Sequence, residues 1–179
     1  IYERDEEADI AMLRAGKTSF HPAELEFLRD LEQTCKRAVH LQCAGGTDTL
    51  SLWKLGAAEV VGVDISEKMI AVARRKSAAL AAPASWYCCD ILDAPSELNR
   101  TADLVYTGKG ALPWMTDIQA WAGVVSRLLK PGGRVYIYEG HPLDWVWDTD
   151  APTYRLSPRT QGYFSDSIVS DRGWSMFSD

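Results

Sequence analysis

A loop of small residues lies at positions 42–48, where Gln42-Cys43-Ala44-Gly45-Gly46-Thr47-Asp48 follows an apolar run and leads directly into a helical pattern. Small side chains let a ligand approach the backbone, and the exposed N–H groups at a helix start can donate hydrogen bonds to it. We therefore interpret this loop as part of a ligand site. A turn that needs glycine only for its backbone conformation explains the loop equally well.

Acidic residues follow the next two apolar runs. A carboxylate at Asp64, which precedes Ile65, is placed to accept hydrogen bonds from the ribose hydroxyls of an adenosine-containing ligand. An acid that only stabilises the helix N-terminus is the alternative, but Ser66 already supplies a cap, which favours the ribose role. Asp90 would bind the adenine amino group while Ile91 packs on the ring; a solvated loop acid is the alternative.

The elements that must position these residues alternate between strands and helices. Apolar runs predict strands at residues 38–42, 59–63, 85–89, 103–106 and 134–138, and helical patterns lie at 22–34, 47–55, 66–81 and 117–129. This alternation predicts an α/β fold with a doubly wound, mostly parallel sheet and helices on both faces. The ends of the strands then meet at one edge, where Thr107 and Gly108 after the fourth strand would join the same ligand site.

Composition excludes several classes of protein. The chain has 179 residues, a formal net charge of −6 and a pI near 5.1, which argues against a nucleic-acid partner because phosphate binding needs clustered Lys and Arg. No apolar run is long enough to span a membrane. Four cysteines without zinc or disulfide spacing predict reduced core thiols in a cytoplasmic protein and no metal site.

Over about residues 20–140 the sequence resembles the class I S-adenosylmethionine (SAM)-dependent methyltransferases. The string VHLQCAGGTDTLSLWKLGAAEVVGVDISEKMIAVAR resembles that family's first two motifs, DLVYTGKGALPW its fourth-strand motif, and RLLKPGGRVYIYE its entry into the fifth strand. The chain departs from the family where His40 replaces the usual acid of the first strand and where Gln42 and Ala44 replace two glycines. These departures leave open which group holds the amino end of the cofactor's methionine portion.

The resemblance implies a Rossmann-like domain that binds SAM at Gln42–Asp48, Asp64–Ile65, Asp90–Ile91 and Thr107–Gly108, and that methylates a small molecule. A SAM-binding regulator without catalysis is the alternative. An NAD-dependent dehydrogenase is disfavoured because the loop lacks a third glycine in register. A nucleic-acid methyltransferase is disfavoured by charge and by the residues Thr107–Gly110, which replace the Asn/Asp-Pro-Pro-Tyr type of motif.

Methyl transfer mainly needs alignment of the acceptor and exclusion of water. An oxygen or protonated amine acceptor also needs a base, for which His141 is the candidate because histidine titrates near neutrality; a simple turn at His141-Pro142 is the alternative. Aromatic residues would either line an acceptor pocket or cap the core: Tyr2, Phe20, Trp114, Trp145, Trp147 and Trp174.

The predicted organisation has three parts. Residues 1–20 form a cover segment, 21–140 the SAM-binding domain, and 141–179 an irregular extension that covers the substrate or is the start of a truncated C-terminal part. We expect the intact protein to continue beyond Asp179 and to supply the missing edge of the sheet, because a bare edge strand is a liability. We also expect Gly46→Val to weaken ligand binding while folding largely survives.

Overall fold

A computed structural model describes residues 5–141 and residue 153. The chain divides into two compact units, Ile1–Tyr138 and Glu139–Asp179. The description below concerns the first unit, which contains all the predicted strands and every predicted cofactor-binding residue.

Five parallel strands form the sheet of this unit, in the order β3-β2-β1-β4-β5. They are β1 Arg37–Leu41, β2 Glu59–Asp64, β3 Ala84–Cys88, β4 Ala102–Gly108 and β5 Leu129–Tyr138. The strand order runs outward from β1 in one direction and then restarts beside it with β4. A crevice is expected outside the carboxyl ends of the strands at this reversal.

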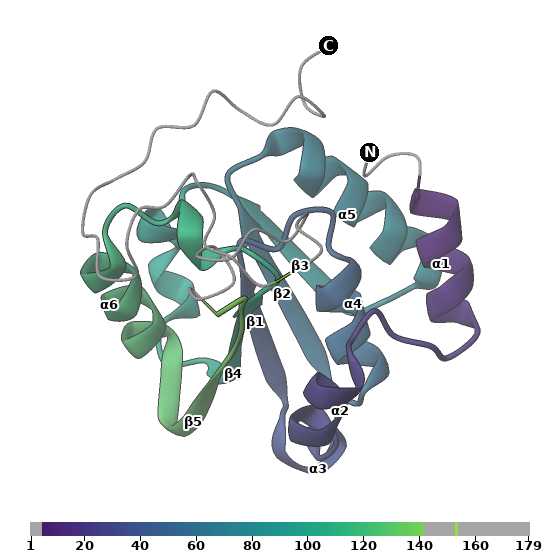
Figure 1. The fold of residues 1–179 in the computed structure, drawn as a ribbon, viewed down its shortest axis with the longest axis horizontal. Coiled ribbons are helices and arrows are strands. Elements are labelled where there is room, and N and C mark those ends of the chain that lie inside the picture. Colours follow the sequence, from purple (N-terminus) through teal and green to yellow (C-terminus); the bar gives the residue numbers. More distant parts are fainter. Residues whose placement is uncertain (1–4, 142–152, 154–179) are drawn as a thin grey trace. The chain divides into compact units, whose positions relative to one another are not determined.

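Helices cover both faces of the sheet, as Figure 1 shows, so the predicted doubly wound α/β fold is confirmed. On one side lie α1 Glu6–Arg14, α4 Thr47–Lys54 and α5 Glu67–Leu80, and on the other lies α6 Ile118–Leu128. Two short helices, α2 Pro22–Leu28 and α3 Leu31–Thr34, precede β1, and 3₁₀ turns follow β3 and β4 at Ile91–Asp93, Ser96–Leu98 and Leu112–Trp114. The predicted cap at Ser66 is present, since its side chain accepts a hydrogen bond from the Met69 N–H.

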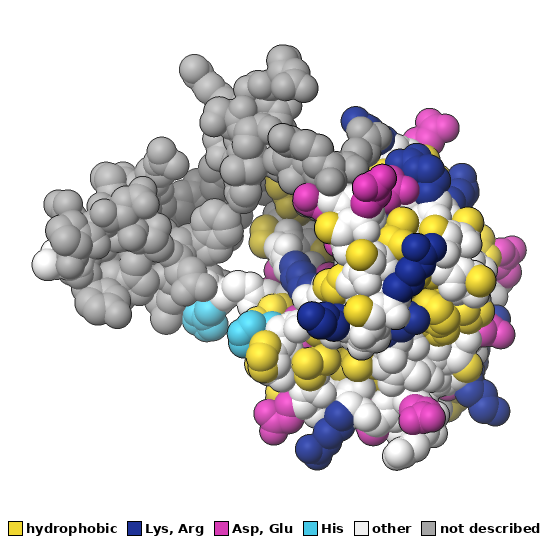
Figure 2. Space-filling view, turned by 90° about the vertical axis from the view of Figure 1, so that its right-hand side faces the viewer, with side chains coloured by type: hydrophobic (Ala, Val, Ile, Leu, Met, Phe, Trp, Pro, Cys, Tyr) yellow, Lys and Arg dark blue, Asp and Glu magenta, His cyan; other side chains and the backbone are white. Residues whose placement is uncertain are grey.

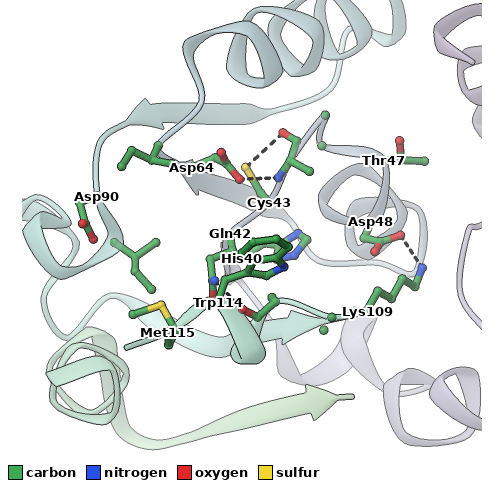
Figure 3. Close-up of a pocket in the computed structure, with 18 of the residues that line it drawn as sticks. His40, Gln42, Cys43, Thr47, Asp48, Asp64, Asp90, Lys109, Trp114 and Met115 are labelled. Carbon is green, nitrogen blue, oxygen red and sulfur yellow. Dashed lines mark hydrogen bonds and ion pairs between the residues drawn. The ribbon is translucent and has the colours of Figure 1, made fainter. Parts of the chain in front are cut away.

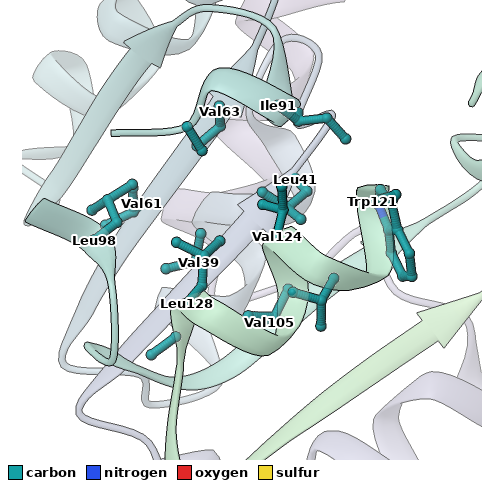
Figure 4. Packing of buried hydrophobic residues seen from close by; sticks show 13 residues of the cluster. Val39, Leu41, Val61, Val63, Ile91, Leu98, Val105, Trp121, Val124 and Leu128 are labelled. Carbon is teal, nitrogen blue, oxygen red and sulfur yellow. The ribbon is translucent and has the colours of Figure 1, made fainter. Parts of the chain in front are cut away.

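Apolar side chains on the two faces of the sheet build two core clusters. Figure 4 shows the first, in which β-branched residues of the central strands pack against Trp121, Val124 and Leu128 of α6. The second lies under the opposite face and includes Leu28, Leu31 and Tyr106. The two clusters pack against the two faces of the sheet and hold the strands whose carboxyl ends carry the candidate site.

Three details differ from the sequence-based expectations. The helix predicted over residues 22–34 is broken at Arg29–Asp30, where the Asp30 carboxylate binds Arg134 of β5 and its carbonyl accepts the first hydrogen bonds of α3. The fifth strand, predicted over residues 134–138, begins earlier, so that Pro131-Gly132-Gly133 lies inside β5; the β4–β5 register is irregular there, moving from Ala102↔Leu129 to Leu104↔Arg134. Cys88 is exposed rather than in the core; all four cysteines are free.

The first helix is attached more firmly than a surface cover. Leu13 of α1 is fully buried, and Phe20 after it belongs to the second core cluster. The Asp9 carboxylate lies 2.6 Å from the Lys76 ammonium of α5, and Lys76 is almost fully buried. Figure 2 shows the face to which α1 contributes, on which positive and negative side chains are interspersed among apolar ones. The segment therefore contributes to the core as well as to the surface.

Candidate active site

An open cavity of about 690 Å³ lies at the carboxyl ends of the strands, within the range of roughly 300–1,000 Å³ that small-molecule sites occupy. Figure 3 shows the residues around it. The cavity is lined by His40, Gln42, Cys43, Ala44, Gly45, Gly46, Thr47, Asp48, Asp64, Ile65, Asp90, Ile91, Leu92, Gly108, Lys109, Gly110, Ala111, Trp114, Met115 and Thr116. All the predicted cofactor-binding residues except Thr107 are in this set.

The loop after β1 has the backbone conformation of a glycine-rich loop, although two of its three residues with positive φ are not glycine. The backbone φ angle is +58° at Gln42, +44° at Ala44 and +76° at Gly46. Residues with a Cβ adopt this left-handed region at a cost of roughly 1–2 kcal/mol each. The loop shape is therefore retained at the positions where the chain lacks the glycines of the family it resembles.

The backbone of Gly46 lines the cavity, but a side chain at this position would point at protein atoms. A Cβ at this position would lie 2.5 Å from Cη2 of Trp86 on β3 and 2.8 Å from Cβ of Ala73 on α5. A valine would collide with both and would occupy an unfavourable φ. The expectation that Gly46→Val spares folding is therefore wrong, and the glycine serves the packing of the loop against Trp86.

Asp64 holds the loop in place. Its Oδ2 accepts a hydrogen bond of 2.8 Å from the Ala44 N–H, and its Oδ1 accepts one of 2.9 Å from the Ser66 N–H. Figure 3 shows this carboxylate against the loop. Each carboxylate oxygen has a further lone pair, so the group can accept a ligand hydroxyl without losing these bonds. The predicted ribose role of Asp64 is compatible with its second role as a brace.

Asp90 lies at the same end of the cavity as Asp64 (Figure 3). Its Oδ1 accepts a hydrogen bond of 2.9 Å from the Leu92 N–H, which caps the 3₁₀ turn that begins at Ile91. Ile91 is buried in the first core cluster and contributes to the cavity wall, whereas Ile65 is 70% exposed at the rim. Two apolar walls and a carboxylate thus surround the region predicted for the adenine ring.

The opposite end of the cavity carries an ion pair. The Lys109 ammonium lies 2.7 Å from Asp48 Oδ1 and also donates to the Ser19 carbonyl, while the Ser19 hydroxyl donates to Asp48. Thr47, next to Asp48, donates its hydroxyl to Asp9 and accepts from Lys76. Polar contacts from the N-terminal segment, from α5 and from the loop after β4 therefore hold the start of α4 in place.

His40 also forms part of the cavity wall, where the charges of Asp48 and Lys109 act on it. The ring is 3% exposed, its Nδ1 lies 2.8 Å from the Thr49 hydroxyl, and it meets Tyr106 edge to face. Burial, opposed by Asp48, lowers the pKa of His40 to about 4, so the ring is neutral at pH 7. Burial also raises the pKa of the Cys43 thiol, with Asp64 adding to the effect, so this thiol stays protonated.

Several predictions for individual residues need correction or lie beyond the structure. Thr107 is fully buried and does not line the cavity. Phe20 packs in the core rather than in the cavity wall, whereas Trp114 does line the cavity. His141 belongs to the second unit, so its role as a base stays a prediction. Tyr2, Trp145, Trp147 and Trp174 lie outside the described residues.

Other lining residues carried signals that the sequence-based prediction of the site did not use. His40 occupies the position of the acid that is usual in the resembled family, and Lys109 directly follows Thr107 and Gly108, the residues predicted for the site after the fourth strand. Leu92, Met115 and Thr116 follow strand ends by several residues. Only the folded connections show that these side chains return to the cavity.

No helix among the described residues is long and apolar enough to cross a membrane, and the same part of the chain holds no group of three or more side chains suited to a metal ion.

Comparisons with known proteins point in one direction. The sequence model of a family described as "Methyltransferase domain" matches residues 38–133. The chain is 29% identical over 117 residues to a ubiquinone biosynthesis O-methyltransferase of Chromobacterium violaceum, a match that covers 65% of this chain and 50% of the relative. It is 25% identical over 154 residues to the ribosomal protein L11 methyltransferase of Aliivibrio salmonicida, covering 86% and 48%.

The structure agrees with these sequence matches. A crystal structure of a SAM-dependent methyltransferase from Mesorhizobium loti superposes with a TM-score of 0.60 at 28% identity, covering 75% of this chain and 64% of that one. The chain spans about half the length of the curated relatives it matches. Its parallel sheet, its loop after β1 and the family match over more than half of its length show that the chain belongs to the class I SAM-dependent methyltransferases.

Proposed function

We propose that this protein transfers the methyl group of SAM to a small, uncharged or cationic acceptor that binds beside Trp114. The arrangement of the cavity carries the proposal: acids suited to adenosine lie at one end, an ion pair lies at the other, and an exposed indole lies between them (Figure 3).

The charge of the cavity suits SAM. Its lining contains three carboxylates, Asp48, Asp64 and Asp90, and one ammonium, Lys109, while His40 is neutral. The lining therefore has an excess of two negative charges. SAM carries a sulfonium, an ammonium and a carboxylate, so its net charge complements that excess. A dinucleotide would place a pyrophosphate beside Asp48, where like charges repel.

Trp114 makes the middle of the cavity apolar. Its side chain is 75% exposed although it lines the cavity, and Met115 follows it. An exposed tryptophan offers a broad flat surface for a planar or apolar molecule. The family includes the ubiquinone biosynthesis O-methyltransferase reported above, whose named pathway concerns a small molecule, and this supports the proposed class of acceptor.

The bound cofactor supplies an activated methyl group, so the protein's residues act mainly by position. Asp64 orients the ribose and keeps the loop in shape through Ala44 and Ser66. Trp114 places the acceptor and helps to exclude water. His141 is the candidate base for acceptors that must lose a proton, a role that we propose rather than assign.

Binding and transfer can be tested separately. In a thermal-shift titration the protein should respond to S-adenosylhomocysteine and not to NAD or NADP, and Asp64→Ala and Asp90→Ala should each weaken the response. Each lost charge-assisted hydrogen bond should lower affinity by roughly 1.5–3 kcal/mol. Tight NAD binding without a response to S-adenosylhomocysteine would contradict the proposal.

The acceptor class needs an assay of methyl transfer on a metabolite panel, with ribosomal protein L11 as a protein substrate in parallel. Trp114→Ala should raise the KM for the acceptor and leave the affinity for S-adenosylhomocysteine unchanged. Transfer to the protein substrate alone would refute a small acceptor. Binding of SAM without transfer to any acceptor would favour the non-catalytic alternative.

A further inference from the structure

The ion pair between Asp48 and Lys109 has unused hydrogen-bonding capacity on both of its members. Asp48 Oδ1 accepts from Lys109 and from the Ser19 hydroxyl, whereas within the described part of the chain Oδ2 has no hydrogen-bond partner. The Lys109 ammonium has three N–H donors, of which Asp48 and the Ser19 carbonyl take two. One acceptor and one donor of opposite charge are thus left side by side at the cavity wall.

This pair is a built feature of the cavity. The Asp48 side chain is 17% exposed and that of Lys109 34%, so both are partly withdrawn from water. The Ser19 segment approaches from the N-terminal part of the chain, and the Lys109 ammonium lies 5.4 Å from the centre of the Phe20 ring. These contacts hold both charges in fixed positions before any ligand arrives, which lowers the ordering cost of binding.

His40 provides an independent observation at the same place. It is buried and lines the cavity, and among the described residues Thr49 at Nδ1 is its hydrogen-bond partner, which leaves Nε2 without one. A ring nitrogen in a cavity wall can exchange one hydrogen bond with water or with a ligand group. The part of the cavity wall formed by His40, Asp48 and Lys109 is therefore suited to polar groups of a ligand.

The position of the Asp48–Lys109 pair in the cavity indicates which polar groups of the ligand it would bind. Asp64 and Asp90 lie at one end of the cavity and Asp48 with Lys109 at the other, as Figure 3 shows. A ligand whose adenosine lies at the first end places its amino-acid portion toward the second. That portion is a zwitterion, with one ammonium and one carboxylate, and a neutral ion pair with one free acceptor and one free donor matches both charges.

We propose that Asp48 and Lys109 together recognise the amino-acid end of the cofactor, Asp48 binding its ammonium and Lys109 its carboxylate. This assignment rests on the proposed function. In this chain the acid that binds the ammonium would then lie in the first turn of α4. In the family the usual acid lies on the first strand, at the position that His40 occupies here.

Three probes separate the charges without an activity assay. S-adenosylhomocysteine carries both the ammonium and the carboxylate, decarboxylated SAM keeps the amine alone, and 5′-methylthioadenosine lacks the whole amino-acid end. By calorimetry, Asp48→Asn should weaken S-adenosylhomocysteine and decarboxylated SAM by roughly ten- to a hundredfold and leave 5′-methylthioadenosine unchanged. Lys109→Met should weaken S-adenosylhomocysteine and spare the other two.

Controls distinguish recognition from structure. Asp93→Asn removes one charge from an exposed residue outside the cavity lining and should change none of the three affinities. Asp90→Ala should weaken all three probes because they share adenosine. If Asp48→Asn lowers the affinity for 5′-methylthioadenosine as much as for S-adenosylhomocysteine, or changes neither, the assignment is wrong. If the wild-type protein binds none of the probes, the proposed function fails and this assignment with it.

Discussion

The buried ion pair between Asp9 and Lys76 makes a testable prediction about how α1 is held. The Lys76 side chain is 2% exposed and that of Asp9 23%. The ammonium lies 2.6 Å from the Asp9 carboxylate and 2.7 Å from the Thr47 hydroxyl. Removing Asp9 therefore leaves a buried charge with a single neutral partner, whereas removing Lys76 leaves a carboxylate that still reaches water.

The two single variants should therefore differ. Breaking a buried pair by removing one partner costs about 3–5 kcal/mol when the remaining charge stays buried, and we expect Asp9→Ala to approach this range. Lys76→Met fills the same space without a charge and should cost about 1–2 kcal/mol, mainly from the lost hydrogen bonds. The double variant should be more stable than Asp9→Ala, because it removes the uncompensated charge.

Urea unfolding of the wild type, both single variants and the double variant measures this cycle. Thr34→Ala, which alters an exposed hydroxyl that bonds only within its own helix region and to Arg134, serves as a control for general destabilisation. The reasoning fails if Lys76→Met is more destabilising than Asp9→Ala, or if the double variant is the least stable of the four proteins. Either result would mean that packing, not the buried charge, determines the effect.

Further predictions concern glycine packing and pH. Gly62→Ala should lower the free energy of unfolding by about 1–3 kcal/mol, because the added Cβ would overlap the Trp86 ring and the Cys43 Sγ. Gly123→Ala in α6 should raise the free energy of unfolding by roughly 1 kcal/mol, because its Cβ would meet no atom within 4 Å and alanine favours the helix. Urea unfolding measures both effects. Because burial lowers the pKa of His40 from 6.5 to about 4, the unfolded chain takes up a proton that the folded protein excludes as the pH falls through this window. Stability should then fall by up to about 3 kcal/mol between pH 6.5 and 4, relative to a His40→Gln variant measured at the same pH values; parallel curves for the two proteins would contradict it.

The amino-acid sequence alone determined the fold class and most of the candidate site. Alternating apolar runs and helical patterns predict a parallel sheet, and every such sheet brings the carboxyl ends of its strands to one edge. The residues directly after the strands, such as Asp64 and Asp90, could therefore be assigned to one cavity without coordinates. Thr107 was placed wrongly because its position within β4 fixes which way its side chain points, and the strand continues to Gly108.

The tertiary structure decided which groups meet across that edge. Nothing in local sequence pairs Asp48 with Lys109 or Asp9 with Lys76, because these partners are 61 and 67 residues apart and meet only when separate connections fold over the sheet. The lack of space for a side chain at Gly46, beside Trp86, likewise depends on the packing of β3 and α5 against the loop. Local patterns specify the elements and their order, whereas contacts between distant residues arise from packing in three dimensions, which no short stretch of sequence encodes.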